Sequence, residues 1–322
     1  MATVSATDAQ SASGSAPGIV LSENFSEVLR ANLDLVKQRV WGRKLMGTKF
    51  FNNEPMSGAN VRIGEFYGIG LVPQNRDSET LPTDDPGQGF VKQYDAVTYR
   101  LAVMWEQSTI DDDKLGVIGK RQAKFLEAAN KTIEYQLADV FNRGFGTSGA
   151  PFLCADGMWL FDSARPNPKA GVASWSNLET AAALTADSLW DMDKNFAASK
   201  DEIGLKAPLD MAGIVVPKAL EKKAAELSRS AKNPENSMNT DNYHGGLVYN
   251  VWNYLTSDTA WFGFAEGGFQ SPDNELYLFI RERPNVKTYA PANNPDVSAQ
   301  RVRFRHTMGA GRPSAWRGNA GA

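Results

Sequence analysis

The chain has 322 residues, of which 42% are hydrophobic and 22% are charged, and its formal net charge is only −3. This length suits one large domain or two ordinary ones with a buried core. The 34 basic and 37 acidic side chains nearly balance, which argues against a histone-like or sliding DNA binder with a strongly basic surface. A near-neutral charge is compatible with many copies of one chain lying side by side.

The chain carries no signal for secretion or for a membrane. Its single cysteine, Cys154, excludes an internal disulfide framework and fits synthesis in a reducing cytoplasm. No stretch approaches 18 apolar residues, so we expect no membrane partner. Residues 1–20 are rich in small polar residues and lack the basic start and apolar run of a signal peptide. We predict that they form a disordered tail.

Two kinds of periodicity follow the tail. Residues 23–41 place apolar side chains at helical spacing, and loop residues dominate 47–58, which predicts a lone helix on an arm. Strand-like alternation then runs through 61–72, where Ile63, Tyr67, Ile69 and Leu71 share a face, and more cleanly through 96–105. We expect these two strands to pair as an extended hairpin.

The connection between those strands, residues 73–89, is long, polar and rich in proline and glycine. Its charged residues are mostly acidic: Arg76, Asp77, Glu79, Asp84 and Asp85. A loop of this length inside a compact domain is usually functional or disordered. We therefore expect the hairpin tip to reach away from the body, with its acids meeting basic side chains of another copy.

The most regular stretch is Thr109–Arg143, where apolar residues recur at threes and fours until Gly144. Asp111–Asp113 place negative charge where a helix N-terminus favours it. Gly116 and Gly119 weaken the first turns, so the firm helix is expected from about Lys120. The full run would be about 50 Å long, and it needs one long partner surface, which we expect to be a sheet.

The remainder alternates helices and short strands, which predicts an α+β fold. Pro217 stands where a first helical residue is expected. The expected helices are 184–199 and 219–228, and the expected strands are 211–216, 247–251, 260–265, 276–281 and 301–308. The last of these, the closing strand, places Val302, Phe304, His306 and Met308 on one side and Arg301, Arg303 and Arg305 on the other.

The chain offers no convincing catalytic or cofactor motif. Residues 144–149 match G-x-G-x-x-G, but they end a helix, whereas a dinucleotide fingerprint follows a strand and opens a helix. His244, His306 and Cys154 are scattered, and Asp111–Asp113 lack the spacing of a calcium loop. We therefore expect no catalytic residue, no cofactor and no metal, and we do not expect an enzyme.

The order of these parts resembles the Hong Kong 97-type capsid fold of tailed bacteriophages. The more specific likeness lies in the apolar strand 212–217 that runs through proline into the helix 219–228, and in the closing residues 303–311 and 315–318. The resemblance divides the chain into the family's parts. These are the disordered tail (1–20), the N-terminal arm (21–58), the E-loop hairpin (59–108), the P domain with its spine helix (109–173), the A domain (174–285) and the return to the P domain (286–322).

The resemblance implies a major capsid (head) protein that self-assembles through pentamers and hexamers into an icosahedral shell around double-stranded DNA. It implies a place in the virion after assembly in the host cytoplasm, with a portal, possible decoration proteins and, because the tail is too short for a fused scaffold, a separate scaffolding protein. Two alternatives stay open: an encapsulin-type compartment shell, and a soluble α+β enzyme with an unrecognised site.

Candidate contacts between copies are charged residues on the arm, the hairpin and the closing strand. They are Arg39, Arg43, Arg76, Asp84, Asp85, Lys92, Arg301, Arg303 and Arg305. The closing-strand arginines have three possible roles: a solvated or salt-bridged surface, pairing with a neighbour's acids near Asp84 and Asp85, or contact with DNA phosphates. Some family members crosslink copies through a lysine, but the partners of Lys92 in such a bond find no match in this sequence, so the resemblance does not extend to that chemistry.

Overall fold

The computed structural model describes residues 45–75, 80–84, 86–106, 117–146, 153–235, 240–266, 275–289 and 297–322. The predictions for the tail, for the arm helix at 23–41 and for Asp111–Asp113 lie outside these residues. Within them the fold is mixed α+β, as the sequence predicted.

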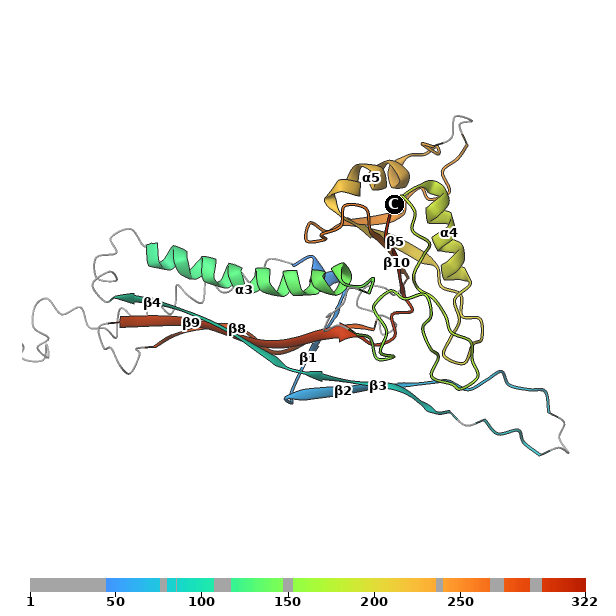
Figure 1. The fold of residues 1–322 in the computed structure, drawn as a ribbon, viewed down its shortest axis with the longest axis horizontal. Coiled ribbons are helices and arrows are strands. Elements are labelled where there is room, and N and C mark those ends of the chain that lie inside the picture. Colours follow the sequence, from blue (N-terminus) through green and yellow to red (C-terminus); the bar gives the residue numbers. More distant parts are fainter. Residues whose placement is uncertain are drawn as a thin grey trace, which may run out of the picture.

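A four-stranded sheet, the long sheet, forms the base of the molecule (Figure 1). Its order is β1 (Asn52–Pro55), β8 (Leu276–Tyr289), β9 (Val297–Ala310) and β4 (Val97–Glu106). β9 pairs antiparallel with both neighbours, and β1 runs parallel to β8. The predicted alternation of the closing strand is confirmed, because Val302, Phe304 and Met308 are buried while the arginines between them are not.

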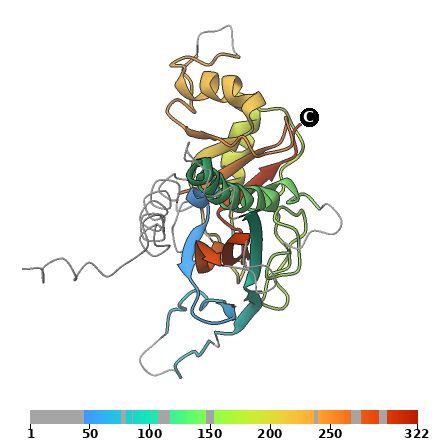
Figure 2. The same ribbon diagram turned by 90° about the vertical axis from the view of Figure 1, so that its left-hand side faces the viewer.

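The long helix α3 (Val117–Asn142) runs along one face of the long sheet, as Figures 1 and 2 both show. Its apolar stripe, including Ile133 and Leu137, is buried there, which confirms the predicted spine over these residues. Gly144 donates its N–H to the carbonyl of Phe141, and Gly146 takes a positive φ of 90°. The glycine-rich stretch thus ends a helix, as expected.

A second four-stranded sheet builds a compact lobe on the α3 side of the long sheet. Its order is β10 (Trp316–Asn319), β7 (Trp261–Ala265), β5 (Met211–Val216) and β6 (Val248–Val251), and its helices are α4 (Ala186–Ala197) and α5 (Glu221–Arg229). Thr185 caps α4 in a reciprocal capping box with Ser188.

The predicted place of Pro217 is wrong by one position. It has φ −69° and ψ 165°, so it is the extended N-cap of the short 3-10 helix η2 (Lys218–Leu220) and not a first helical residue. The extended ψ continues β5 to its end, and the helical turn then begins one residue later, with α5 following from Glu221.

An aromatic core joins the long sheet, α3 and the lobe. The ring of Phe141, at the end of α3, lies with its centroid 5.1 Å from Trp316, 5.5 Å from Trp252 and 5.2 Å from Phe262. Phe50 and Phe51, which directly follow the short 3-10 helix η1 (Gly47–Lys49), add two further rings beside Phe141. All of these rings are essentially inaccessible to solvent, so this part of the chain completes its hydrophobic core by itself.

The hairpin differs from the predicted one. β2 (Asn60–Phe66) pairs with β3 (Gln88–Asp95), whereas β4, the expected partner, belongs to the long sheet. The pairing of 61–72 with 96–105 is therefore wrong. The chain turns at Ala96, whose N–H donates to the Ala59 carbonyl, and the apolar alternation of β4 serves the long sheet instead. The hairpin extends well beyond the body, on the side of the long sheet opposite the lobe (Figures 1 and 2).

Candidate assembly surfaces

The outer part of the hairpin exposes apolar side chains. Leu71 is 79% exposed and Val72 91%, and Phe66, Ile69 and Leu81 are similarly open. Asp84 accepts a hydrogen bond from the Gly70 N–H at 2.7 Å, which holds a carboxylate beside this apolar segment. Soluble monomers rarely expose contiguous apolar surface of this kind, and where it occurs it usually marks an interaction site.

The base of the hairpin, by contrast, packs on its own body. Tyr94 and Phe279 form a small buried cluster with Met56, their rings 5.0 Å apart, against the face of the long sheet opposite α3. Lys92 places its Nζ 4.9 Å from the centre of the Tyr94 ring and donates to the carbonyls of Leu153 and Ala310. Burial lowers the pKa of Lys92. These contacts lie within one copy, and the predicted role of Lys92 between copies stays a prediction.

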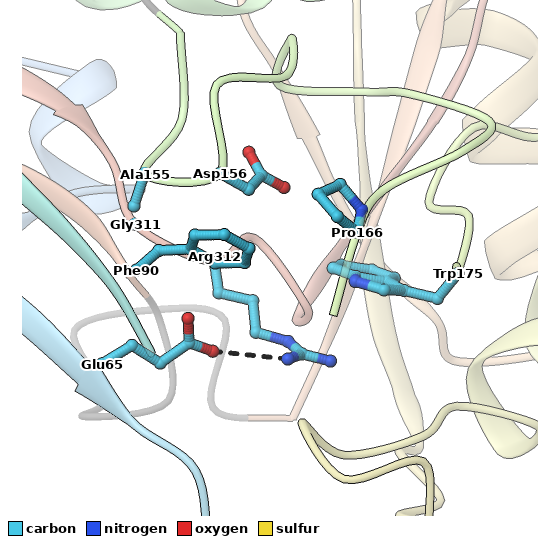
Figure 3. Close-up of a pocket in the computed structure, with 8 residues that line it drawn as sticks. All are labelled: Glu65, Phe90, Ala155, Asp156, Pro166, Trp175, Gly311 and Arg312. Carbon is cyan, nitrogen blue, oxygen red and sulfur yellow. Dashed lines mark hydrogen bonds and ion pairs between the residues drawn. The ribbon is translucent and has the colours of Figure 1, made fainter. Parts of the chain in front are cut away.

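Arg312 joins the hairpin to the rest of the chain, as Figure 3 shows. Its Nη1 lies 3.3 Å from Glu65 Oε1 on β2 and 3.9 Å from Glu202 Oε1 on a loop of the lobe. Its guanidinium lies 4.9 Å from the centre of the Trp175 ring. The arginine is almost fully buried, and its contacts connect the hairpin, the lobe and the long sheet. We call Arg312 and the carboxylates around it the Arg312 joint.

The Arg312 joint contains more acidic side chains than basic ones. Glu275, at the start of β8, accepts a hydrogen bond from the Arg312 backbone N–H, and burial raises the pKa of its carboxyl to about 7. Burial also raises the pKa of Glu65, while the Arg312 charge opposes that shift. Three carboxylates thus face one arginine. Local sequence patterns do not predict this cluster, because its residues are far apart in the chain: 247 residues separate Glu65 from Arg312.

The closing-strand arginines lie on the hairpin side of the long sheet. The strand register places Arg100 of β4 opposite Arg303 and Lys287 of β8 opposite Arg301, which makes a basic face. Arg303 pairs with Glu282 at 3.4 Å, and the Arg301 guanidinium lies 5.7 Å from the Tyr289 ring centre. The salt-bridged interpretation therefore holds for Arg303, and the other two roles stay predictions.

Within one copy, the structure separates the two charged regions that were predicted to meet between copies. The hairpin tip, near Asp84, and the far ends of β4 and β9 lie at opposite ends of the molecule (Figure 1). Asp84 therefore contacts none of the closing-strand arginines of its own copy. The remaining predicted contacts, Arg39, Arg43, Arg76 and Asp85, lie outside the described residues.

The histidines and the cysteine occupy ordinary packing positions. His306 stacks on Tyr99, with ring centres 4.9 Å apart, and its Nε2 lies 2.7 Å from Gln136 Oε1 of α3. Burial lowers the pKa of His306 to about 4 and raises the pKa of the Cys154 thiol. Across the described residues, no cluster of three His, Cys, Asp or Glu side chains has the arrangement to hold a metal ion. None of the described helices combines the length and apolar character that crossing a bilayer requires.

Comparison with known proteins decides the family. A family model described as phage capsid protein matches residues 89–319. The chain belongs to the phage capsid protein family. No curated protein sequence matches it.

Solved structures from phages share the fold of this capsid protein at low sequence identity. A cyanophage P-SCSP1u capsid chain is 9% identical with a TM-score of 0.56, covering 85% of this chain and 87% of the other. A chain of Mycobacterium phage Patience is 14% identical with a TM-score of 0.54, covering 96% and 90%. A chain of Microbacterium phage Oxtober96 is 15% identical with a TM-score of 0.51, covering 86% and 90%.

The predicted α+β capsid fold and the predicted role as a capsid protein of the phage head are thereby confirmed, and assembly through pentamers and hexamers stays a prediction. The chain is a phage capsid protein, a structural component of the virion, and copies of it form the shell of the phage head. The boundaries of arm, E-loop hairpin, P domain and A domain stay predictions.

Proposed function

We propose that this capsid protein builds the head through pentamers and hexamers in which the hairpin of one copy lies on the next. The exposed apolar hairpin carries this proposal. Leu71 and Val72 are almost as open to solvent as in an unfolded chain, so folding of one subunit leaves their burial incomplete. Covering such surface contributes about 25 cal/mol per Å², and a neighbouring copy is the surface always at hand during shell assembly.

The shape of the subunit supports a ring. The hairpin leaves one end of the molecule, and the basic face of β4 and β9 lies toward the other end (Figure 1). A contact between two different surfaces of the same chain is heterologous, and successive heterologous contacts close into a ring when the rotation fits. The carboxylate of Asp84 and the guanidinium of Arg100 give these two surfaces opposite charge.

Further partners follow from the same proposal. The shell would enclose double-stranded DNA without base-specific contacts, assemble in the host cytoplasm, and need a portal and a separate scaffolding protein, with decoration proteins optional. The proposed role is structural and includes no catalysis. Nucleic acid and a portal inside purified particles would also separate a phage head from a cargo compartment of similar fold.

Hairpin truncation tests the proposal. Replacing residues 68–86 by Asn-Gly joins Tyr67 to Gly87, which are already hydrogen-bonded across the hairpin at 3.2 Å, through a two-residue turn. The buried base around Tyr94 and the Arg312 joint stay intact. We expect the melting temperature of the free subunit to change little and closed shells to be lost in electron micrographs.

A matched control keeps the hairpin and changes a side chain elsewhere on the surface. Lys222→Gln on α5 removes an exposed charge that forms a long ion pair with Glu226, at 3.8 Å. This control is expected to assemble as the wild type does. Normal shells from the truncated chain would refute the proposed role of the hairpin.

A further inference from the structure

The long sheet has an open edge at β4. Among the described residues, β4 pairs with β9 alone, along its whole length from Val97 to Glu106. The strand contains no proline or glycine. α3 packs on β9 and β8, so the α3-side residue Leu101 stays 55% exposed, and Val97 and Val103 are exposed beside it. A long, unpaired and apolar edge is a ready template for another strand.

The outer hairpin carries a segment that has the sequence pattern of a strand but no strand beside it. Residues 67–72 alternate like a strand, with Tyr67, Ile69 and Leu71 on one side and glycines between them, yet β2 ends at Phe66. The facing part of the hairpin contains Pro82 and Pro86, which lack the N–H that a ladder needs. Between residues 68–72 and the rest of the described chain, the hydrogen bond formed is that of the Gly70 N–H with the Asp84 side chain.

We propose that residues 67–72 of one copy add as an extra strand to the open edge of β4 in another copy. This inference rests on the proposed function and specifies its contact. The outer hairpin extends from the body in one direction and β4 runs from the hairpin base in the other, so residues 67–72 and β4 lie apart in one molecule and meet only between copies (Figure 1). Strand addition supplies backbone hydrogen bonds to both elements and leaves side chains to set the register.

The side chains of the two elements match in this arrangement. Ile69 and Leu71 lie beside the exposed Leu101 and Val103, on the α3 side of the sheet. The glycines then fall on the other side, next to Arg100 and Ala102, where the absence of a Cβ lets a second backbone approach. Asp84, which is held against Gly70 at 2.7 Å, brings a carboxylate to the side of the sheet that carries Arg100.

Cysteine crosslinking tests this arrangement in assembled full-length chains. Side chains of one strand point alternately to opposite faces, and only same-face neighbours on paired strands approach closely enough for a disulfide. We expect Leu71→Cys subunits, mixed with Leu101→Cys or Val103→Cys subunits, to yield covalent dimers under mild oxidation. The parity control Ala102→Cys is expected to give roughly tenfold less dimer. The native Cys154 is buried and serves as the unmodified background.

A second pair of variants separates backbone pairing from simple apolar docking. Leu71→Pro removes an N–H and is expected to reduce shell yield more than Leu71→Thr, which keeps the N–H and the strand preference. Neither substitution is expected to shift the melting temperature of the free subunit, because Leu71 is exposed there.

The results that would contradict strand addition differ from those that would contradict the proposed role of the hairpin. Normal shells in which Leu71→Cys links to no β4 position, or links to odd and even positions equally, would overturn strand addition and leave the role of the hairpin standing. Self-linked Leu101→Cys dimers would replace it by pairing of two β4 edges. Normal shells from the truncated hairpin would remove both proposals together.

Discussion

The core around Phe141 and the outer hairpin differ in how they treat apolar side chains: the core buries them within one chain, and the hairpin leaves them in solvent. Phe141 is fully buried and is surrounded by rings from β7, β10, the loop after β6 and Phe50, which follows η1, all supplied by one chain. Leu71 and Val72 are equally apolar and remain in solvent. The first region shows what the subunit needs in order to fold. The second shows what it leaves for other copies to complete.

The largest expected effect on subunit stability comes from a substitution in the aromatic core around Phe141. Phe141→Ala removes a ring that touches several others and leaves a cavity, which typically costs about 3–5 kcal/mol of unfolding free energy. Leu71→Ala removes an apolar group that is already exposed to solvent and should change the unfolding free energy by less than about 0.5 kcal/mol. Urea unfolding of the free subunits measures both. Comparable losses would mean that the hairpin belongs to the subunit core.

A buried ion pair should give the next largest effect. Arg165 is completely buried and lies 2.8 Å from the nearly buried Asp156. Asp156→Ala leaves an uncompensated buried guanidinium, which typically costs about 3–5 kcal/mol, while Asp84→Ala on the exposed hairpin should cost almost nothing. Thermal melts of the two variants side by side give the comparison, and equal melting temperatures would contradict it.

The Arg312 joint should make stability depend on pH. Burial and nearby carboxylates raise the pKa of Glu275 to about 7 from its usual 4.5. Between these values the folded subunit holds a proton that the unfolded chain has released, so the unfolding free energy falls as pH rises from about 4.5 to about 7. Glu275→Gln should flatten this decline by an amount on the order of 1–3 kcal/mol. Wild-type and variant stability curves that run parallel from pH 5 to 8 would exclude this role.

The comparison between variant and wild type matters because His306 acts in the opposite direction. Burial lowers the pKa of His306 to about 4 from 6.5. The unfolded chain therefore binds more protons between pH 4 and 6.5, and stability rises with pH in that window. Below pH 6.5 the two groups partly cancel in the wild type. The Glu275→Gln difference curve isolates one of them.

The smallest expected effect concerns the basic face. Arg303 and Glu282 are both partly exposed, and their 3.4 Å contact should contribute at most about 1 kcal/mol in a double-mutant cycle with Arg303→Gln and Glu282→Gln. A coupling well above that value would mean that the salt bridge, and not the apolar face under α3, holds the long sheet together.

Local patterns predicted most elements but not how they pair. Helical spacing predicted α3, alternation predicted β4 and β9, and a short apolar run predicted β5, because each pattern depends on side chains near one another in sequence. Alternation states which face a residue occupies and not which strand lies beside it. β3 contains Gln88, Lys92 and Gln93 and shows no alternation of apolar residues. The sequence therefore predicts β4, and not β3, as the partner of β2.

The candidate site was less predictable for a related reason. Lys92 was recognised as a hairpin residue, but its carbonyl partners, Leu153 and Ala310, are 61 and 218 residues away. Arg312 had no motif to single it out, and its carboxylates come from β2, β8 and a loop of the lobe. Such clusters form between residues that are distant in sequence, so local patterns cannot predict them and they become visible only in the complete fold.

Hydrogen exchange on free subunits and on assembled shells tests the central claim most directly. If other copies complete the open surfaces, amides in residues 67–72 and 97–106 should exchange much more slowly in the shell, while those of β5 and β7 in the lobe change little. Equal exchange at 67–72 and 97–106 in the two states would contradict the account.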